Sequence, residues 1–238
     1  MMHPIDIADN IARVRDDISR FAHGRHVDLM LAAKHQPLER LAEAYNAGGT
    51  LMGHNLIDQL ATSTEGLHNA GFFPITSVIG HVQSNKLSVA MQWADRIDTV
   101  DSLKTAQRIN RRQEARLACG EVTGLYPILL QINSSGASTQ FGCSPDSFVE
   151  LARAISALPS IHIAGVMTIG AQGTDTDIRS SFVLTRRLAE EMRNLPGLAD
   201  ADVLSMGMSS DMRIAIEEGS TVVRVGTAIF GARPAQQA

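Results

Sequence analysis

Residues 28–34 read DLMLAAK, a run of five apolar residues that ends in a lysine. A continuous apolar run of this length is typical of a strand that is buried on both faces of a parallel sheet. Seven similar runs follow along the chain. We therefore expect strands at Asp28–Ala33, Leu51–Gly53, Thr76–Gly80, Ile97–Val100, Pro127–Asn133, Ile163–Ile169, Val203–Met206 and Thr221–Val225.

Stretches with helical periodicity separate most of these runs. Apolar residues recur every three or four positions from Phe148 to Leu158, after Ser144 and Pro145, which are typical N-cap and first-turn residues. Alternating strands and helices predict a parallel sheet, and eight such units in 238 residues predict closure into a (β/α)₈ TIM barrel, an α/β fold. We expect one domain over residues 1–238.

An amphipathic helix precedes the first strand. Its apolar residues are spaced three and four apart from Ile7 to Phe21, and we expect this extra helix to plug or flank the barrel. Polar residues interrupt the apolar ones throughout this segment, which is typical of neither a signal peptide nor a membrane span. We therefore expect a cytoplasmic protein with no membrane partner.

The composition excludes several other classes of protein. Hydrophobic residues make up 44% and charged residues 19% of the chain, which favours a soluble globular protein over a disordered one. The net charge is −4 and the basic residues are scattered, so we expect no nucleic-acid partner. Cys119 and Cys143 lack the close spacing of a zinc or disulfide motif, and we expect free thiols.

Polar residues follow several of the expected strands. In a (β/α)₈ barrel the chemistry lies at the carboxyl ends of the strands. The residues found there are Lys34, His54, Asn55, His81, Gln83, Asn133, Ser205, Gly207, Met208, Ser209, Arg224, Gly226 and Thr227.

Lys34 is the first candidate for covalent chemistry. Its position after an apolar strand would partly desolvate the ammonium group, and a neutral amine is a nucleophile for aldehydes. A lysine whose stem packs and whose head reaches water would have the same sequence context. Position alone therefore leaves both interpretations open.

The segment LSMGMSSDM, residues 204–212, is a candidate phosphate cradle. Gly207 allows close approach of the backbone to a ligand, and Ser209 is the expected N-cap of a short helix. Gly226 and Thr227 could supply further amides and a hydroxyl, because phosphate sites in such barrels often lie after strands seven and eight. Either segment alone could be a turn and an ordinary N-cap, whereas the two together favour phosphate.

Arg224 lies within an expected buried strand, where an unpaired guanidinium group would be costly. One possible partner is a carboxylate, with Asp202 and Asp211 as candidates. The other is a ligand that carries a pyridine nitrogen.

Seven segments together resemble the YggS/PROSC family of pyridoxal phosphate homeostasis proteins, whose fold is similar to the N-terminal barrel of alanine racemase. The similarity covers nearly the whole chain. The segments are LMLAAKHQP around Lys34, IGHVQSNK at 79–86, DTVDSLKTAQRINRR at 98–112, LLQINSSGASTQFGCSP at 129–145, GVMTIG at 165–170, LSMGMSSDM at 204–212 and EEGSTVVRVGTAIFGAR at 217–233.

The resemblance implies a fold type III protein that binds pyridoxal 5′-phosphate (PLP) through a Schiff base to Lys34. It also implies that Arg224 faces the pyridine nitrogen. Because arginine only donates hydrogen bonds, this nitrogen would stay unprotonated and the cofactor would be a weak electron sink. The implied cofactor-binding residues are Lys34, Asn55, Met167, Ser205, Gly207, Met208, Ser209, Arg224, Gly226 and Thr227.

Two departures from the family pattern concern the rim beside the cofactor. The family usually has Glu where this chain has His54, and His where it has Ser77. His35, His54 and His81 each follow a strand and could meet at one rim. Their spacing is not that of a metal site, so we expect a polar rim and no metal.

Four functions are compatible with these residues. The resemblance favours a regulator that binds, buffers or delivers PLP to PLP-dependent apoenzymes, without strong turnover of its own. A weak amino-acid racemase is the alternative, although Tyr45 and Tyr126 look misplaced for catalysis. A cofactor-free Schiff-base aldolase would leave Arg224 without a role, and a scaffold with a vestigial site is the fourth interpretation. We expect a monomer, because no second domain is present to form the racemase dimer contact.

Overall fold

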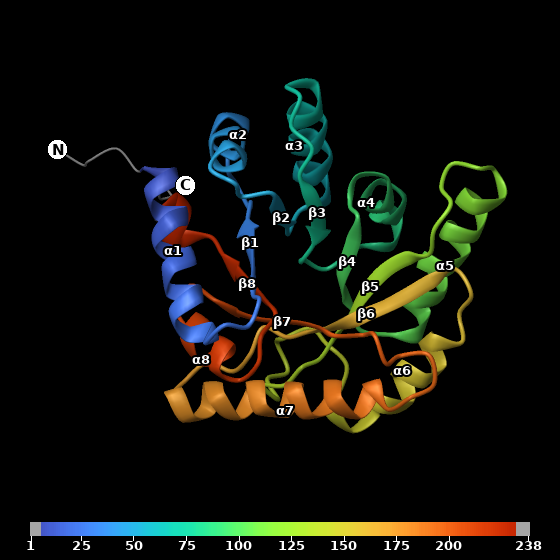
Figure 1. Ribbon diagram of the computed structural model, residues 1–238. Coiled ribbons are helices and arrows are strands. Elements are labelled where there is room, and N and C mark those ends of the chain that lie inside the picture. The colour runs from blue at the N-terminus through green and yellow to red at the C-terminus, as the bar shows by residue number, and fades with distance from the viewer. Residues whose placement is uncertain (1–5, 232–238) are drawn as a thin grey trace.

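The computed structural model describes residues 6–231, and its strands close into a parallel barrel in which β8 pairs with β1. Figure 1 shows the strands in the centre with the helices around them. The expected (β/α)₈ barrel is therefore confirmed. The strands are β1 (Asp28–Ala32), β2 (Leu51–His54), β3 (Ile75–Val78), β4 (Arg96–Val100), β5 (Tyr126–Gln131), β6 (Ile161–Met167), β7 (Val203–Met208) and β8 (Val222–Val225).

Helices connect successive strands and cover the outside of the barrel. The α-helices are α1 (Ile7–Ala22), α2 (Leu38–Asn46), α3 (Ile57–Asn69), α4 (Leu87–Trp93), α5 (Leu103–Ala118), α6 (Phe148–Ser156), α7 (Asp175–Arg193), α8 (Met212–Glu217) and α9 (Thr227–Phe230). Two short 3₁₀ helices, η1 (Ser84–Lys86) and η2 (Pro145–Ser147), precede α4 and α6. Within residues 6–231, no helix combines the length and the apolar character that a bilayer crossing requires.

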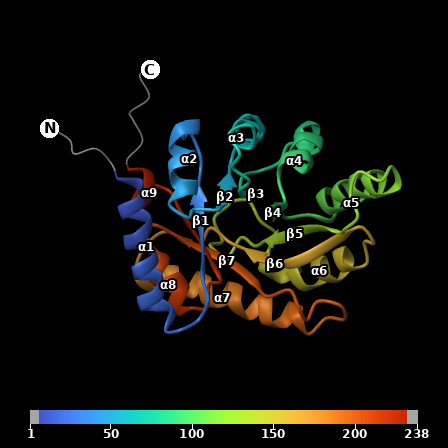
Figure 2. The same ribbon diagram turned by 45° about the horizontal axis from the view of Figure 1, so that its top comes forward.

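The N-terminal helix α1 flanks the barrel and does not plug it. It packs against α2, α8 and α9, and Figures 1 and 2 both show it beside α8. Its buried stripe includes Ile7, Ile11, Val14 and Ile18, which matches the spacing expected from the sequence. Asp6 caps the helix by accepting a hydrogen bond from the backbone N–H of Asp9 at 2.9 Å.

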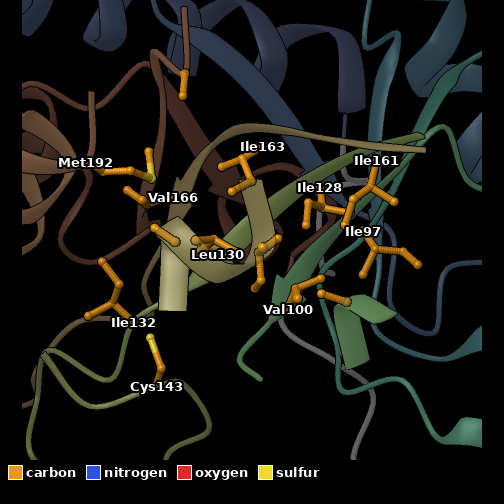
Figure 3. Close-up of a cluster of buried hydrophobic side chains, with 14 of the residues drawn as sticks. Ile97, Val100, Ile128, Leu130, Ile132, Cys143, Ile161, Ile163, Val166 and Met192 are labelled. Carbon is orange, nitrogen blue, oxygen red and sulfur yellow. The ribbon is translucent and has the colours of Figure 1, made fainter. Parts of the chain in front are cut away.

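The largest apolar cluster lies between the strands and the outer helices. Figure 3 shows side chains of β4, β5 and β6 meeting there, together with Met192 from α7. Ile128 and Leu130 of β5 are fully buried in this cluster, as is Val166 of β6. Burial of each such side chain contributes about 1.5–3 kcal/mol, so this layer holds the strands in the register that forms the barrel mouth.

Several strands end one or two residues away from the expected position: β1, β3, β5 and β6 end earlier, and β2 and β7 end later. β3 ends at Val78 and β6 at Met167, before the expected ends at Gly80 and Ile169. A Cβ atom at Gly80 would lie 2.2 Å from the backbone oxygen of Asn55, so this position allows only glycine. The chain therefore leaves the sheet earlier and passes close to the loop that carries Asn55.

Candidate functional site

A cavity of about 690 Å³ lies at the carboxyl end of the barrel, among the residues that follow β1, β2, β7 and β8. This volume is typical of a small-molecule site. The cavity brings together most of the residues expected to bind a cofactor. Those that line it are Lys34, Asn55, Met208, Ser209, Arg224, Gly226 and Thr227.

The other three expected residues are not among those that line the cavity. Ser205 is fully buried, and its Oγ accepts a hydrogen bond from Nη1 of Arg224 at 2.8 Å. Met167 is 1% exposed and pairs with Ser205 in the β6–β7 register. Gly207 has a φ of 93°, and a Cβ atom there would lie 2.4 Å from Cβ of Ala215. Of the three, Ser205 supports the cavity directly, through its hydrogen bond with Arg224.

Lys34 lies in a tight turn that begins directly after β1. The next residue, His35, has a φ of 60°, a left-handed conformation that non-glycine residues rarely adopt. Gln59 of α3 holds this turn: its Oε1 accepts from the His35 backbone N–H at 2.9 Å, and its Nε2 donates to the Ala33 oxygen at 3.2 Å. Gln59 is not among the residues expected from the sequence, because nothing in its local sequence links it to a turn 24 residues earlier.

Arg224 enters the cavity from β8 with only 5% of its surface exposed. Nη1 donates to the backbone oxygen of Ser205 at 2.9 Å as well as to its Oγ, and Nη2 donates to the backbone oxygen of Thr168 at 2.8 Å. Burial lowers the pKa of this guanidinium, while the charges of Asp98 and Asp211 oppose that shift. Three neutral acceptors therefore fix the group in place.

No carboxylate lies within 4 Å of the Arg224 guanidinium among the described residues. Asp202 and Asp211, the two candidates from the sequence, are therefore not its ion-pair partners. The carboxylate alternative for Arg224 was wrong, and a positively charged donor stands at the cavity wall without a protein anion in contact.

The loop between β7 and α8 differs in detail from the expected cradle. Helix α8 begins at Met212 with Asp211, not Ser209, in the N-cap position. Oδ1 of Asp211 accepts a hydrogen bond from the Met208 backbone N–H at 2.5 Å. Burial raises the pKa of Asp211, although this hydrogen bond and the charge of Arg224 oppose the rise. Ser209 is thus released from capping and lines the cavity.

Four backbone N–H groups at the cavity have no internal acceptor. Within residues 6–231, the amides of Ser209, Ser210, Thr227 and Ala228 donate no hydrogen bond to a backbone or side-chain atom. All four residues line the cavity. Unpaired amides from two neighbouring loops are the donors that phosphate groups bind in proteins.

The three histidines of the expected rim do not converge. His35 is exposed, and His81 stacks on Phe141 with ring centroids 4.6 Å apart. His54 is fully buried, and neither imidazole nitrogen has a hydrogen-bond partner among the described residues. Burial lowers the pKa of His54 to about 4. The expected polar rim at His54 was therefore wrong. Over residues 6–231, no group of three His, Cys, Asp or Glu side chains could hold a metal ion.

His54 is buried because β2 continues through it. Alternate residues of a strand share a face, and Met52 packs in the cluster beneath α1 and α2. His54 shares that face and points away from the cavity, whereas the following residue, Asn55, lines it. Ser77 is also buried, and its Oγ lacks a partner among the described residues. Both departures from the family pattern thus lie in the barrel wall.

Neither tyrosine faces the cavity. Tyr45 lies on α2 and packs against Phe72, with ring centroids 5.3 Å apart. Tyr126 begins β5, and its hydroxyl donates to the backbone oxygen of Ala94 at 2.8 Å. Burial raises the pKa of Tyr126. Among the residues that line the cavity, Lys34 and Arg224 are the ionisable ones.

Comparisons with known proteins agree with this arrangement. The model of the alanine racemase N-terminal domain family matches residues 7–234. The chain is 37% identical over 212 residues to the pyridoxal phosphate homeostasis protein of Vibrio alginolyticus, covering 87% of each chain. It is 35% identical over 235 residues to the Escherichia coli K12 protein of the same name, covering 96% of this chain and 97% of the other.

A solved structure extends the comparison. PipY of Synechococcus elongatus PCC7942, determined with PLP bound, superposes with a TM-score of 0.82 at 29% sequence identity. The match covers 94% of this chain and 100% of the other. The chain therefore belongs to the family of pyridoxal phosphate homeostasis proteins, within the group that has the alanine racemase N-terminal domain fold.

Proposed function

We propose that this chain binds PLP covalently through Lys34 and buffers the cofactor or delivers it to PLP-dependent apoenzymes. Relatives that share at least 35% of their residues with this chain are named for PLP homeostasis, and the PipY structure holds PLP. The observation that carries the proposal is that Lys34, Arg224 and four unpaired backbone amides line one cavity.

The choice of lysine follows from the composition of the chain. Only three lysines are present: Lys34, Lys86 and Lys104. Lys34 lines the cavity. Lys86 belongs to η1, and its Nζ is paired with Oδ1 of Asp58 at 2.6 Å on the surface. Lys104 lies on α5 and is not among the lining residues. Lys34 is therefore the amine placed to react with an aldehyde in this cavity.

The remaining residues of the cavity fit the other parts of the cofactor. The unpaired amides of Ser209, Ser210, Thr227 and Ala228 suit a dianionic phosphate group, and Thr227 adds a hydroxyl. Arg224 suits the pyridine nitrogen, because its guanidinium is a pure hydrogen-bond donor. Acceptors on β7 and directly after β6 hold it in place. The backbone at Gly226 passes close to β1, since a Cβ atom there would lie 3.3 Å from Cβ of Ala32.

The same residues argue against strong turnover. PLP, when bound, supplies an aldehyde for amines and a ring that accepts electrons from an adjacent carbanion. Racemisation requires two acid/base groups on opposite faces of the reacting carbon. Lys34 provides one such group, and the described residues of the cavity offer no tyrosine, histidine, cysteine or carboxylate as the second. Arg224 leaves the ring nitrogen unprotonated, which weakens its pull on electrons. We therefore assign holding and release of the cofactor, and not catalysis, to this site.

On this proposal residues 1–238 act as one domain and as a monomer. The test is a titration of the purified protein with PLP, followed by visible absorbance, for the wild type, Lys34→Ala and Lys86→Ala. The wild type and Lys86→Ala should develop the absorbance band of lysine-bound PLP, and sodium borohydride should remove it. Lys34→Ala should lack this band. A wild-type protein that takes up no PLP would contradict the proposal.

A second assay separates regulation from catalysis. PLP-loaded protein is mixed with an excess of a PLP-dependent apoenzyme, and the recovery of its activity is compared with the recovery in free PLP. In parallel, L-alanine and L-serine are incubated with the loaded protein, and the D-isomers are measured by chiral chromatography. Cofactor transfer without racemisation is the expected result. Sustained racemisation that Lys34→Ala abolishes would make the chain an enzyme.

A further inference from the structure

A second cavity of about 720 Å³ lies at the opposite end of the barrel, where β3, β4 and β5 begin. Its walls come from α3, α4 and α5 and from the segments that lead into the three strands. Figure 2 shows these three helices following one another around the barrel. Because the Lys34 cavity is formed by residues at the carboxyl ends of β1, β2, β7 and β8, the two cavities share no residue.

Aromatic rings form one side of this second cavity. His68 lies between Phe73, with ring centroids 5.0 Å apart, and Trp93, with ring centroids 6.1 Å apart. Phe73 is 66% exposed, and Ile75 and Leu125 on the same rim are 57% and 53% exposed. Exposed apolar side chains that surround a concave surface are typical of binding sites. This aromatic wall suits a planar ring.

The inner wall of the cavity is closed by a buried residue of α3. Thr64 of α3 lines the cavity and is only 2% exposed. Its Oγ1 has no hydrogen-bond partner among the described residues. This oxygen is itself shielded from solvent, so the aromatic rim, and not the Thr64 hydroxyl, provides the contact surface for a ligand.

The charges at the cavity favour a cation over an anion. Oδ2 of Asp95 accepts hydrogen bonds from the backbone N–H and Oγ1 of Thr76, at 2.7 and 3.1 Å. No Lys, Arg or His side chain among the described residues lies within 4 Å of the Asp95 carboxylate. Arg116, the one arginine that lines the cavity within residues 6–231, is already paired with Glu121 at 2.8 Å and donates to the Met91 oxygen at 2.9 Å.

We propose that this cavity is a second ligand site, which takes a small molecule composed of a planar aromatic ring and a positively charged nitrogen. The ring stacks on the Phe73, His68 and Trp93 wall, and the cation lies between the aromatic faces and the carboxylate of Asp95. The site is separate from Lys34, so its occupation does not depend on bound PLP.

Trp93 provides the measurement, because it is the only tryptophan in the chain and lines this cavity. Its fluorescence, excited selectively at the red edge of the tryptophan band, is followed while the full-length PLP-loaded protein is titrated with benzyltrimethylammonium, which cannot react with an aldehyde. Benzyl alcohol and phenylacetate are the matched neutral and anionic probes. A saturable change with a Kd on the order of 1 mM is expected for the cation, and at least about tenfold weaker binding for phenylacetate.

Two variants test the assigned contacts. Asp95→Asn keeps an acceptor for Thr76 and should weaken binding of the cation about fivefold, with little effect on benzyl alcohol. Asp200→Asn, an exposed change outside the cavity, should bind like the wild type. Lys34→Ala should bind the cation unchanged, which separates this site from the proposed PLP site.

Four outcomes would overturn the proposal, three of them in the titrations. The first is an absence of saturable change at Trp93 with all three probes. The second is equal binding of cation and anion, and the third is an Asp95→Asn protein with wild-type affinity. A Trp93 spectrum that changes when the protein is diluted without any probe would instead indicate that a second copy covers this face, and would also overturn the ligand site.

Discussion

The side-chain oxygen of Gln59 lies 2.9 Å from the backbone nitrogen of His35, and this contact joins α3 to the turn that carries Lys34. His35 has a left-handed backbone conformation, which costs a non-glycine residue about 1–2 kcal/mol. Nε2 of Gln59 holds the other side of the turn through the oxygens of Ala33 and Gln36. The position of the Lys34 amine therefore depends on a residue outside the cavity.

Replacing Gln59 should weaken the site more than it weakens the fold. Gln59→Leu removes all three hydrogen bonds to the turn, and we expect PLP affinity to fall about tenfold, or roughly 1.4 kcal/mol. Gln59→Glu keeps an acceptor for the His35 N–H, so its PLP affinity should lie between those of Gln59→Leu and the wild type. Thr62→Val, on the exposed side of α3, serves as the control. A Gln59→Leu protein that binds PLP like the control would show that the turn needs no support.

His54 should make the protein sensitive to acid. Its pKa in the folded state is about 4, below the ordinary value of 6.5, so between these values the unfolded chain binds more protons. The free energy of unfolding should therefore fall as the pH drops from about 6.5 to 4, and His54 should account for about 3 kcal/mol of this loss. In His54→Leu this loss should vanish. Urea unfolding of both proteins at neutral pH and at two acidic pH values down to about 4 measures the difference, and parallel pH profiles would refute the assignment.

Gly207 should tolerate no side chain, because two constraints act on it. Its φ of 93° disfavours L-residues, and a Cβ atom would lie 2.4 Å from Cβ of Ala215. Gly207→Ala should cost about 2–4 kcal/mol in unfolding free energy. Gly120 is the matched control, because its φ is 73° and a Cβ atom there would meet no atom within 4 Å. Gly120→Ala should therefore cost only about 1 kcal/mol. Equal losses in urea unfolding would show that the contact with Ala215 relaxes freely.

The two cysteines should differ in reactivity. Cys143 is 8% exposed, and burial raises its pKa to about 12, whereas Cys119 is exposed at the end of α5. Because thiolates are the reactive form, a thiol reagent should label about one group per native chain and two in denaturant. Cys119→Ser should abolish the native reaction. Rapid labelling of Cys143 in the native protein would mean that the loop after β5 opens readily.

The strands could be predicted from the sequence because each is a short apolar run bounded by polar residues. The run before Lys34 and the run that contains Val222 and Val223 both appear as strands, and the closed order of strands places Lys34 and Arg224 at one cavity. Their adjacency depends on the pairing of β1 with β8, at the two ends of the chain. This pairing could be predicted only from the expected closure of the barrel, because no local sequence pattern indicates that β1 and β8 are neighbours.

The surroundings of each site residue were harder to predict. Arg224 donates to the backbone oxygen of Thr168, 56 residues away. Because every residue has a backbone oxygen, the sequence cannot indicate which one accepts this bond. The prediction of His54 as a rim residue was wrong because the expected strand stops at Gly53, whereas β2 continues by one residue. Because side chains alternate between the two faces of a strand, this extra residue places the His54 side chain on the face opposite to the cavity. Helix α8 likewise begins two residues later than a cap at Ser209 would place it.

The most direct test of the proposed function is the mass of the protein after incubation with PLP and reduction with sodium borohydride, followed by peptide mapping. Reduction fixes PLP to whichever lysine holds it, and the chain contains only Lys34, Lys86 and Lys104. We predict one added pyridoxyl phosphate group per chain, on the peptide that contains Lys34, with the other two lysines unmodified. A label on Lys86 or Lys104 in place of Lys34, or no label at all, would contradict the proposal.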